Sequence, residues 1–443
     1  MVTEPLARLE SLPKPDRSKL LEYPTLSLKE RDRRWGLIRK MMKENEVEAL
    51  IVLPGRPPFD DPTNYLTNSG SFWVFFPFQG EPVAFGGGFY TIPSLMNSEA
   101  YGIESWVKDW RFVGKRNVDE LVKILRERGL TSARIGTITS SHFAGPTQAL
   151  MANNLTNSIK TALPNVSFVE LWKPYVQIWL VKSEEEIAMF RKAALAGEVA
   201  AEEFANACKP GNTLLDIQNA VMSTLIPYGV DIMRPTMLGS GPDGGREIYW
   251  LEKGVKPPVL NKGDLVYAEI FCNVGSLHSQ VQPCVSIGEP TAEKKKVASL
   301  AREAYEIGVK TLRPGITFGQ LAEAMNKPQR REAAWGAWKM SPLAHSLNPV
   351  EASDMHPEGM FGPERGFPGL KERFGNVDWL VTDASAGRPR NLDLVIQEGM
   401  TFEFETNACY GPIYVDIGGN ILVTKDGCEE LNKIPTRMVV VPA

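Results

Sequence analysis

The spacing of apolar and polar residues alternates between helix-like and strand-like in the N-terminal part of the chain. The pattern predicts helices at 31–46, 118–128 and 146–162, and strands at 49–53, 71–78 and 133–139. This order predicts an α/β domain over residues 26–180. It is preceded by an arm of residues 1–25, rich in proline and charge, which we expect on the surface or across a partner subunit.

A repeated order of helix, Pro-Gly turn and helix marks the C-terminal part. A long helix is expected to begin at Ser183, where Glu186 three residues later completes a capping box, and to end before the Pro-Gly pair at 210–211. A second helix follows, and the same order returns at 294–325. The repetition indicates duplicated halves within a domain of residues 181–443.

Composition indicates a two-domain globular protein. The 443 residues exceed one ordinary core, and 43% hydrophobic and 23% charged residues lie near the globular average. A net charge of -4 defines no surface for nucleic acid, which is not expected as a partner. No apolar run approaches the about 18 residues of a membrane helix, and the N-terminus does not read as a secretory signal, so a cytoplasmic location without a membrane partner is expected. Five widely spaced cysteines do not favour a disulfide framework or a thiolate zinc site.

Short motifs in the C-terminal part carry a family resemblance. They are the segment at 182–194, the two Pro-Gly turns, the run Gly263-Asp264-Leu265-Val266 and the segments at 398–405 and 421–429. Together they resemble the creatinase/aminopeptidase P/methionine aminopeptidase family over residues 181–442, with a weaker match before them. The resemblance implies an α/β (α+β) fold, in which a creatinase-like N-terminal domain precedes a pita-bread domain of duplicated halves with a curved antiparallel sheet. It also implies a homodimer.

Metal-containing members of this family hold two divalent ions with two aspartates, a histidine and two glutamates. The resemblance aligns these ligands, in that order, with Glu269, Gln280, His345, Glu405 and Gly418. The neutral amide of Gln280 and the missing side chain of Gly418 make a two-metal centre unexpected. Asp416 would replace Gly418 only if the strand register slipped by two residues. We therefore expect no metal or other cofactor; the alternative is a single divalent ion on Glu269, His345 and Glu405.

The histidine that relatives use as a proton shuttle has no counterpart in residues 240–249. We expect His345 to act as general acid and base, with Glu269 and Glu405 as catalytic carboxylates. Four further residues are expected to bind substrate: Arg246, His278, Gln280 and His356. For His278 a structural hydrogen-bonding role fits equally well, and Arg246 would hold a substrate carboxylate or pair with a glutamate. The remaining histidine, His142, is expected on the surface.

Three functions follow from this resemblance. The first is a metal-independent, creatinase-like hydrolase or lyase that acts by acid/base catalysis on a small organic molecule. The second is an Xaa-Pro aminopeptidase-like metallohydrolase with one metal ion. The third is a non-catalytic binding protein on the same scaffold.

Overall fold

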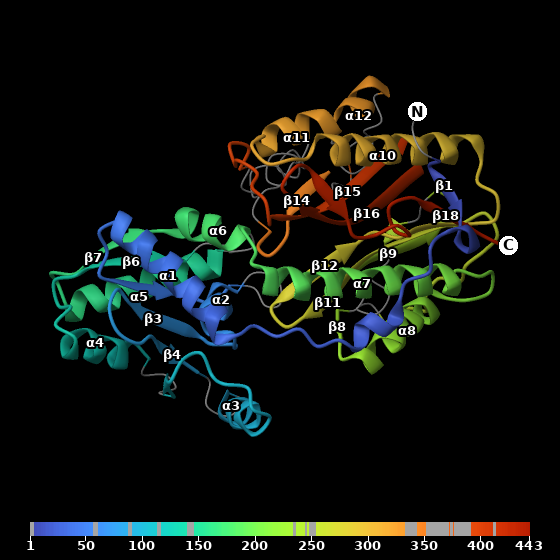
Figure 1. Ribbon diagram of the computed structural model, residues 1–443. Helices are drawn as coiled ribbons and strands as arrows, with labels where there is room; N and C mark the ends of the chain where they lie inside the picture. The colour runs from blue at the N-terminus through green and yellow to red at the C-terminus, as the bar shows by residue number, and fades with distance from the viewer. Residues whose placement is uncertain are drawn as a thin grey trace. The chain divides into compact units, whose positions relative to one another are not determined.

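The computed structural model divides into two compact units. It describes residues 4–55, 61–86, 91–112, 117–139, 146–233, 236–243, 246–247, 254–332, 343–350, 372, 375, 391–410 and 413–443. The N-terminal unit is Thr25–Glu186, and the C-terminal unit combines Met1–Pro24 with Ile187–Ala443 (Figure 1). No helix among the described residues has the length and apolarity that a membrane crossing requires.

The N-terminal unit is built on a mixed sheet with the strand order β5-β4-β3-β2-β6-β7. Its strands are β2 (Ala49–Val52), β3 (Trp73–Pro77), β4 (Val83–Phe85), β5 (Asp109–Arg111), β6 (Arg134–Ile138) and β7 (Ser167–Glu170). Its helices are α1 (Leu28–Glu44), α2 (Pro62–Thr67), α3 (Thr91–Ala100), α4 (Asn117–Glu127), α5 (Pro146–Ala162) and α6 (Trp172–Leu180). The three predicted strands and three predicted helices of this part are all present.

Alternation along β2 explains why all four of its residues are buried. Leu50 and Val52 pack into a cluster that includes side chains of α1, α2 and α6. Ala49 and Ile51 point to the other face, into a cluster that includes side chains of α4 and α5. A strand that is covered on both faces is expected to be apolar throughout rather than at every second position.

The C-terminal unit contains two sheets in its described residues. In the larger one β1, β18, β13, β11, β9 and β10 are neighbours in that order, and β12 and β8 also pair with β11; the smaller one has the order β14-β15-β16-β17. The strands of the larger sheet are β1 (Leu6–Arg8), β8 (Asp231–Ile232), β9 (Thr236–Gly241), β10 (Arg246–Glu247), β11 (Leu265–Val274), β12 (Leu277–Val281), β13 (Cys284–Ile287) and β18 (Met438–Val441). Those of the smaller sheet are β14 (Ala344–Ser346), β15 (Thr401–Tyr410), β16 (Ile413–Val423) and β17 (Cys428–Glu430).

Helices cover these sheets from two sides. They are α7 (Glu184–Ala207), α8 (Leu214–Leu225), α10 (Ala292–Thr311), α11 (Phe318–Met325) and α12 (Lys327–Glu332). Figure 1 shows α7 beside β11 and β12, and α10 along β15 and β16. The hydroxyl of Ser279 on β12 donates to the carbonyl of Ala193 on α7 at 2.6 Å. On the other side, Tyr305 of α10 meets Phe404 of β15 edge-on, with ring centroids 5.7 Å apart. The helices thus pack against β12 and β15, two of the strands that carry the site described below.

The two halves of the C-terminal unit repeat one local motif. Gly211 and Gly315 both have a φ of 90° and are each followed, two residues later, by a threonine that caps the next helix. Both threonines form complete capping boxes, Thr213 with Asp216 and Thr317 with Gln320. The backbone N–H groups of both glycines also donate to a later segment, to Leu260 and Ile396 respectively, at 2.9 Å. The capping box predicted at the start of the long helix is present too, between Ser183 and Glu186.

Candidate active site

Strand register gathers polar side chains on one face of the smaller sheet. Across β15 and β16, Glu405 pairs with Gly418 and Glu403 pairs with Asn420, while His345 of β14 pairs with Glu403. Residues that pair across an antiparallel ladder lie on the same face of the sheet. Asp416 pairs with Asn407 rather than with Glu405. The register slip that would bring Asp416 to the place of Gly418 therefore does not occur.

The larger sheet joins this face through β12. The backbone N–H of Gln282, directly after β12, donates to the carbonyl of Gly418 at 3.3 Å and forms an isolated bridge with it. The backbone N–H of Gln280 donates to the side-chain oxygen of Asn420 at 3.2 Å. These contacts place the side chain of Gln280 between carboxylates of both sheets.

The amide of Gln280 links two of the predicted catalytic glutamates. Its Nε2 donates to Oε1 of Glu269 at 2.7 Å and to Oε2 of Glu405 at 3.3 Å. Glu405 is 2% exposed, whereas Glu269 is half-buried. Glu269 is therefore the more accessible of the two carboxylates, and Gln280 holds both in one cluster without adding charge.

The orientation of His345 is fixed by its neighbour in the chain. Its Nδ1 lies 2.9 Å from the carbonyl oxygen of Ser346, which only accepts, so Nδ1 carries a proton. Its Nε2 faces Oε2 of Glu405 at 3.6 Å. With Nδ1 as donor, the Nε2 lone pair of a neutral ring would face a carboxylate oxygen, an arrangement in which both atoms could ligate one cation.

Glu403 is a member of this cluster that we did not select from the sequence. It is fully buried, and neither of its carboxylate oxygens has a hydrogen-bond partner among the described residues. Burial raises its pKa well above the usual range of a carboxyl group, and the nearby charges of Glu405, Glu269 and Asp416 raise the pKa further. The available signal was alternation, since residues two apart on a strand share a face and Glu405 was already a candidate.

Hydrogen bonds through Asn420 and Asn432 connect the cluster to α7. Asn432 accepts from both the backbone N–H and the side chain of Asn420, at 2.9 and 2.7 Å. Asn432 in turn donates to the carbonyl of Ala194 at 2.9 Å and to the carboxylate of Glu198 at 3.2 Å, both on α7. Since Asn420 contacts the backbone of Gln280, Asn432 positions the cluster without belonging to it.

Asn432→Ala is expected to lower the free energy of unfolding by about 2 kcal/mol, because buried donors of Asn420 and the buried carbonyl of Ala194 lose their partner. Chemical denaturation of the purified protein measures this. Asn157→Ala on α5 is the control, since Asn157 is exposed and its side-chain amide donates to Asn153 on the same helix. The control is expected within about 0.5 kcal/mol of the wild type; equal losses in both variants would contradict the assigned role.

The remaining predicted site residues are placed differently. The backbone of His278 exchanges two hydrogen bonds of 2.9 Å with the side chain of Asn348, and its ring is fully buried in β12. The two roles considered for the His278 ring stay predictions. Arg246 lies in β10, but its side chain is outside the described part of the structure, as are His356 and His142. Their predicted roles stay predictions.

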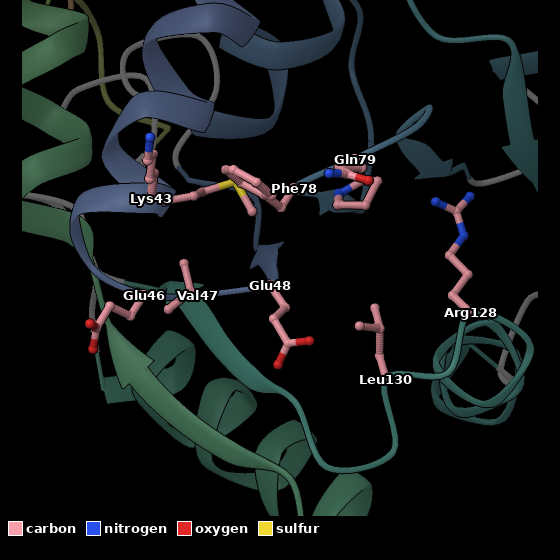
Figure 2. A pocket seen from close by; sticks show the side chains of 10 residues that line it. Lys43, Glu46, Val47, Glu48, Phe78, Gln79, Arg128 and Leu130 are labelled. Atoms are coloured by element: carbon pink, nitrogen blue, oxygen red, sulfur yellow. The ribbon is translucent and has the colours of Figure 1, made fainter.

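The cysteines take no part in the cluster. All five are thiols outside any disulfide; four are buried, and Cys428 is half-buried. Figure 2 shows a pocket of about 800 Å³ that lies wholly within the N-terminal unit and is lined by Lys43, Glu46, Glu48, Arg128 and neighbouring residues. Charges of both signs surround it, and its described lining residues include no histidine or cysteine. The C-terminal cluster is our candidate site.

Comparisons with known proteins identify the family. The model of metallopeptidase family M24 matches residues 188–425, more than half of the chain, and the chain belongs to this family. It is 25% identical over 265 residues to the probable dipeptidase PepE of Mycobacterium tuberculosis (strain ATCC 25618 / H37Rv), a match that covers 59% of this chain and 61% of the relative. It is 23% identical over 191 residues to the uncharacterized peptidase YqhT of Bacillus subtilis (strain 168), covering 43% of this chain and 53% of that protein. These matches thus span less than two thirds of the relatives' length.

Solved structures confirm the fold. Dipeptidase PepE from Mycobacterium ulcerans aligns with a TM-score of 0.67 at 18% identity, over 94% of this chain and all of that chain. X-Pro aminopeptidase from Thermotoga maritima MSB8 aligns with a TM-score of 0.69 at 18% identity, over 92% and 99%. The predicted α/β fold of the pita-bread type is therefore confirmed. Membership of metallopeptidase family M24 supports the prediction of an enzyme, since metallopeptidases are hydrolases.

The residues of the cluster fit one divalent ion better than two. The amide nitrogen of Gln280 donates where relatives are implied to carry a bridging aspartate, and a donor cannot ligate a cation. Gly418 offers no ligand atom. For a single ion, a histidine whose Nδ1 donates to a carbonyl and whose Nε2 faces a carboxylate has the usual arrangement of a ligand. Among the described residues, no three or more His, Cys, Asp or Glu side chains form a group that could hold a metal ion as they stand.

Proposed function

We propose that this protein is a hydrolase that cleaves a short peptide with the help of one divalent cation, held by Glu269, His345 and Glu405. The observation that carries the proposal is the geometry of His345, whose Nε2 faces Oε2 of Glu405 at 3.6 Å while its Nδ1 is occupied by the Ser346 carbonyl. Membership of metallopeptidase family M24 supports the reaction class.

The names of the similar proteins support the substrate class. They include a probable dipeptidase, an X-Pro aminopeptidase and a prolidase from Pyrococcus horikoshii OT3. We propose peptides of two or three residues as substrates, with a proline after the scissile bond among those to be tested. This favours the metal-containing alternative over the metal-independent creatinase-like reaction predicted first. The homodimer expected from the resemblance stays a prediction.

Each residue of the cluster has a distinct role in this proposal. When bound, the cation supplies Lewis-acid activation of the scissile carbonyl. His345, Glu405 and Glu269 would hold it; His345 and Glu405 are buried, and Glu269 is half-buried. The side-chain amide of Gln280 orients the carboxylates of Glu269 and Glu405. Asn420, itself bound by Asn432, holds the backbone of β12 at Gln280.

A second candidate is the metal-independent acid/base hydrolase or lyase. One observation favours it: the amide of Gln280 already donates to both Glu269 and Glu405, so the two carboxylates have partners without a cation. His345 would then act as the general acid and base. The two candidates differ in their response to chelation.

Removal of metal is expected to lower peptide hydrolysis at least about 100-fold, because Lewis-acid activation is lost. The protein, purified without chelators, is assayed with a panel of Xaa-Pro and other dipeptides before and after dialysis against dipicolinate. Re-addition of Mn²⁺, Zn²⁺, Co²⁺ or Fe²⁺ is expected to restore the rate. Dipicolinate saturated with the same metal is the control. Hydrolysis that continues unchanged in excess chelator would contradict the proposal and favour the second candidate.

A further inference from the structure

Position 418 in β16 has no room for a side chain. A Cβ atom built on Gly418 would lie 2.6 Å from Oε1 of Glu403 and 2.6 Å from the backbone oxygen of Phe404, and would overlap the side-chain oxygen of Gln282. Real Cβ atoms essentially never approach other heavy atoms this closely. The space beside Gly418 is therefore filled, and one of the groups that fill it is a carboxylate.

The carboxylate of Glu403 reaches this space from the neighbouring strand. Glu403 pairs with Asn420, and Glu405 pairs with Gly418, so Glu403 is the diagonal neighbour of Gly418 on the same face. The resemblance implied a glutamate at position 418. The structure has no side chain there, but it has a carboxylate oxygen within 2.6 Å of the point where that side chain would begin.

Among the described residues, no hydrogen bond compensates the burial of the Glu403 carboxylate. Its side chain is 0% exposed, and both oxygens lack a hydrogen-bond partner among the described residues. The nearby carboxylates of Glu405, Glu269 and Asp416 oppose a negative charge on Glu403. Buried carboxylates of native proteins normally pair with a cation or accept several hydrogen bonds. A protonated carboxyl would also need an acceptor for its O–H, and none is recorded for Glu403.

We infer that Glu403 replaces the carboxylate lost at Gly418 and is a further ligand of a single divalent cation, together with Glu405 and His345. This inference rests on the single-cation site of the proposed function. It explains why a glycine stands at position 418, since any side chain there would displace the Glu403 carboxylate. It also gives the buried side of the cluster the negative charge that a divalent ion requires.

Glu403→Gln is expected to weaken binding of Mn²⁺ about 100-fold, because a carboxylate ligand becomes a neutral amide of the same size. Chelator-treated wild type and variant are titrated with MnCl₂ by calorimetry, and the free-ion signal is followed by electron paramagnetic resonance. Glu403→Asp, which retains the charge but shortens the side chain, is expected to fall between them. Glu429→Gln is the matched control, since Glu429 is exposed and pairs with Arg191 at the surface; it is expected to bind like the wild type.

The outcomes separate the two proposals. One Mn²⁺ per wild-type chain, with weak binding only in the Glu403 variants, supports both. One ion bound equally by wild type and Glu403→Gln overturns the ligand role of Glu403 and leaves the proposed function standing. No binding by the wild type overturns both. Thermal unfolding in chelator shows that the variants are folded, because loss of a buried unpaired carboxylate is not expected to lower the melting temperature of the metal-free protein.

Discussion

Glu405→Gln is expected to lower peptide hydrolysis by about 1,000-fold. Oε2 of Glu405 is the atom on which the cluster converges, since it accepts from Gln280 Nε2 at 3.3 Å and faces His345 Nε2 at 3.6 Å. An amide at position 405 would keep the shape but remove the negative charge. The glutamine amide can take two orientations. In one, its NH₂ group faces the NH₂ group of Gln280; in the other, it faces the place of the cation. The measurement is kcat/KM for the best dipeptide found, with saturating metal.

The controls for this variant test position and charge separately. Glu429→Gln makes the same chemical change on the surface and is expected to keep the wild-type rate. Glu405→Asp keeps the charge and is expected to recover part of the activity. A kcat/KM of the Glu405→Gln protein near the wild-type value would show that Glu405 is not part of the active site. It would also contradict the argument based on the contact between His345 and Glu405.

Gly418→Glu is expected to lower the free energy of unfolding by about 3 kcal/mol or more, rather than to restore a two-metal centre. The new side chain would begin in space already held by Glu403, Gln282 and the Phe404 carbonyl. The backbone oxygen cannot move without shifting β15, and a further buried carboxylate would join an already acidic cluster. Denaturant unfolding in the presence of chelator measures the effect.

Gly427→Glu is the matched control, because a Cβ at Gly427 would have no atom within 4 Å. Its stability is expected to stay within about 0.5 kcal/mol of the wild type. Gly418→Ala should also be less stable than the wild type, because the clash begins at Cβ itself. A Gly418→Glu protein that folds normally and gains a second metal ion would show that the space beside residue 418 is open.

Local patterns were sufficient to predict most of the fold. The capping box at Ser183 and the strand at 49–53 depend on residues close in sequence, and both are present. The repeated Pro-Gly turns indicated the duplication, and the structure repeats even their capping threonines. The short elements α2 and β4 were not predicted: α2 follows a run rich in proline and aspartate that is typical of a loop, and β4 has only three residues.

The site was harder to predict, because its contacts join strands far apart in the chain. The family pattern directed attention to Glu405 and Gly418, and it has no place for Glu403. Which carboxylate fills the space beside Gly418 depends on the β15–β16 register and on the approach of Gln282 from the other sheet. The two hydrogen bonds of the Gln280 amide likewise depend on how β12 meets β15 and β16. None of these distances follows from composition or spacing.

The most direct test of the central claim is the metal content of the protein purified without chelators, measured by elemental analysis at known protein concentration for zinc, iron, manganese, cobalt and nickel. We expect about one divalent ion per chain, held by the cluster around Glu405. Two ions per chain would contradict the argument that Gln280 and Gly418 exclude a second site. A value near zero that does not rise on incubation with any of these metals would contradict the single-cation hydrolase and leave the metal-independent candidate.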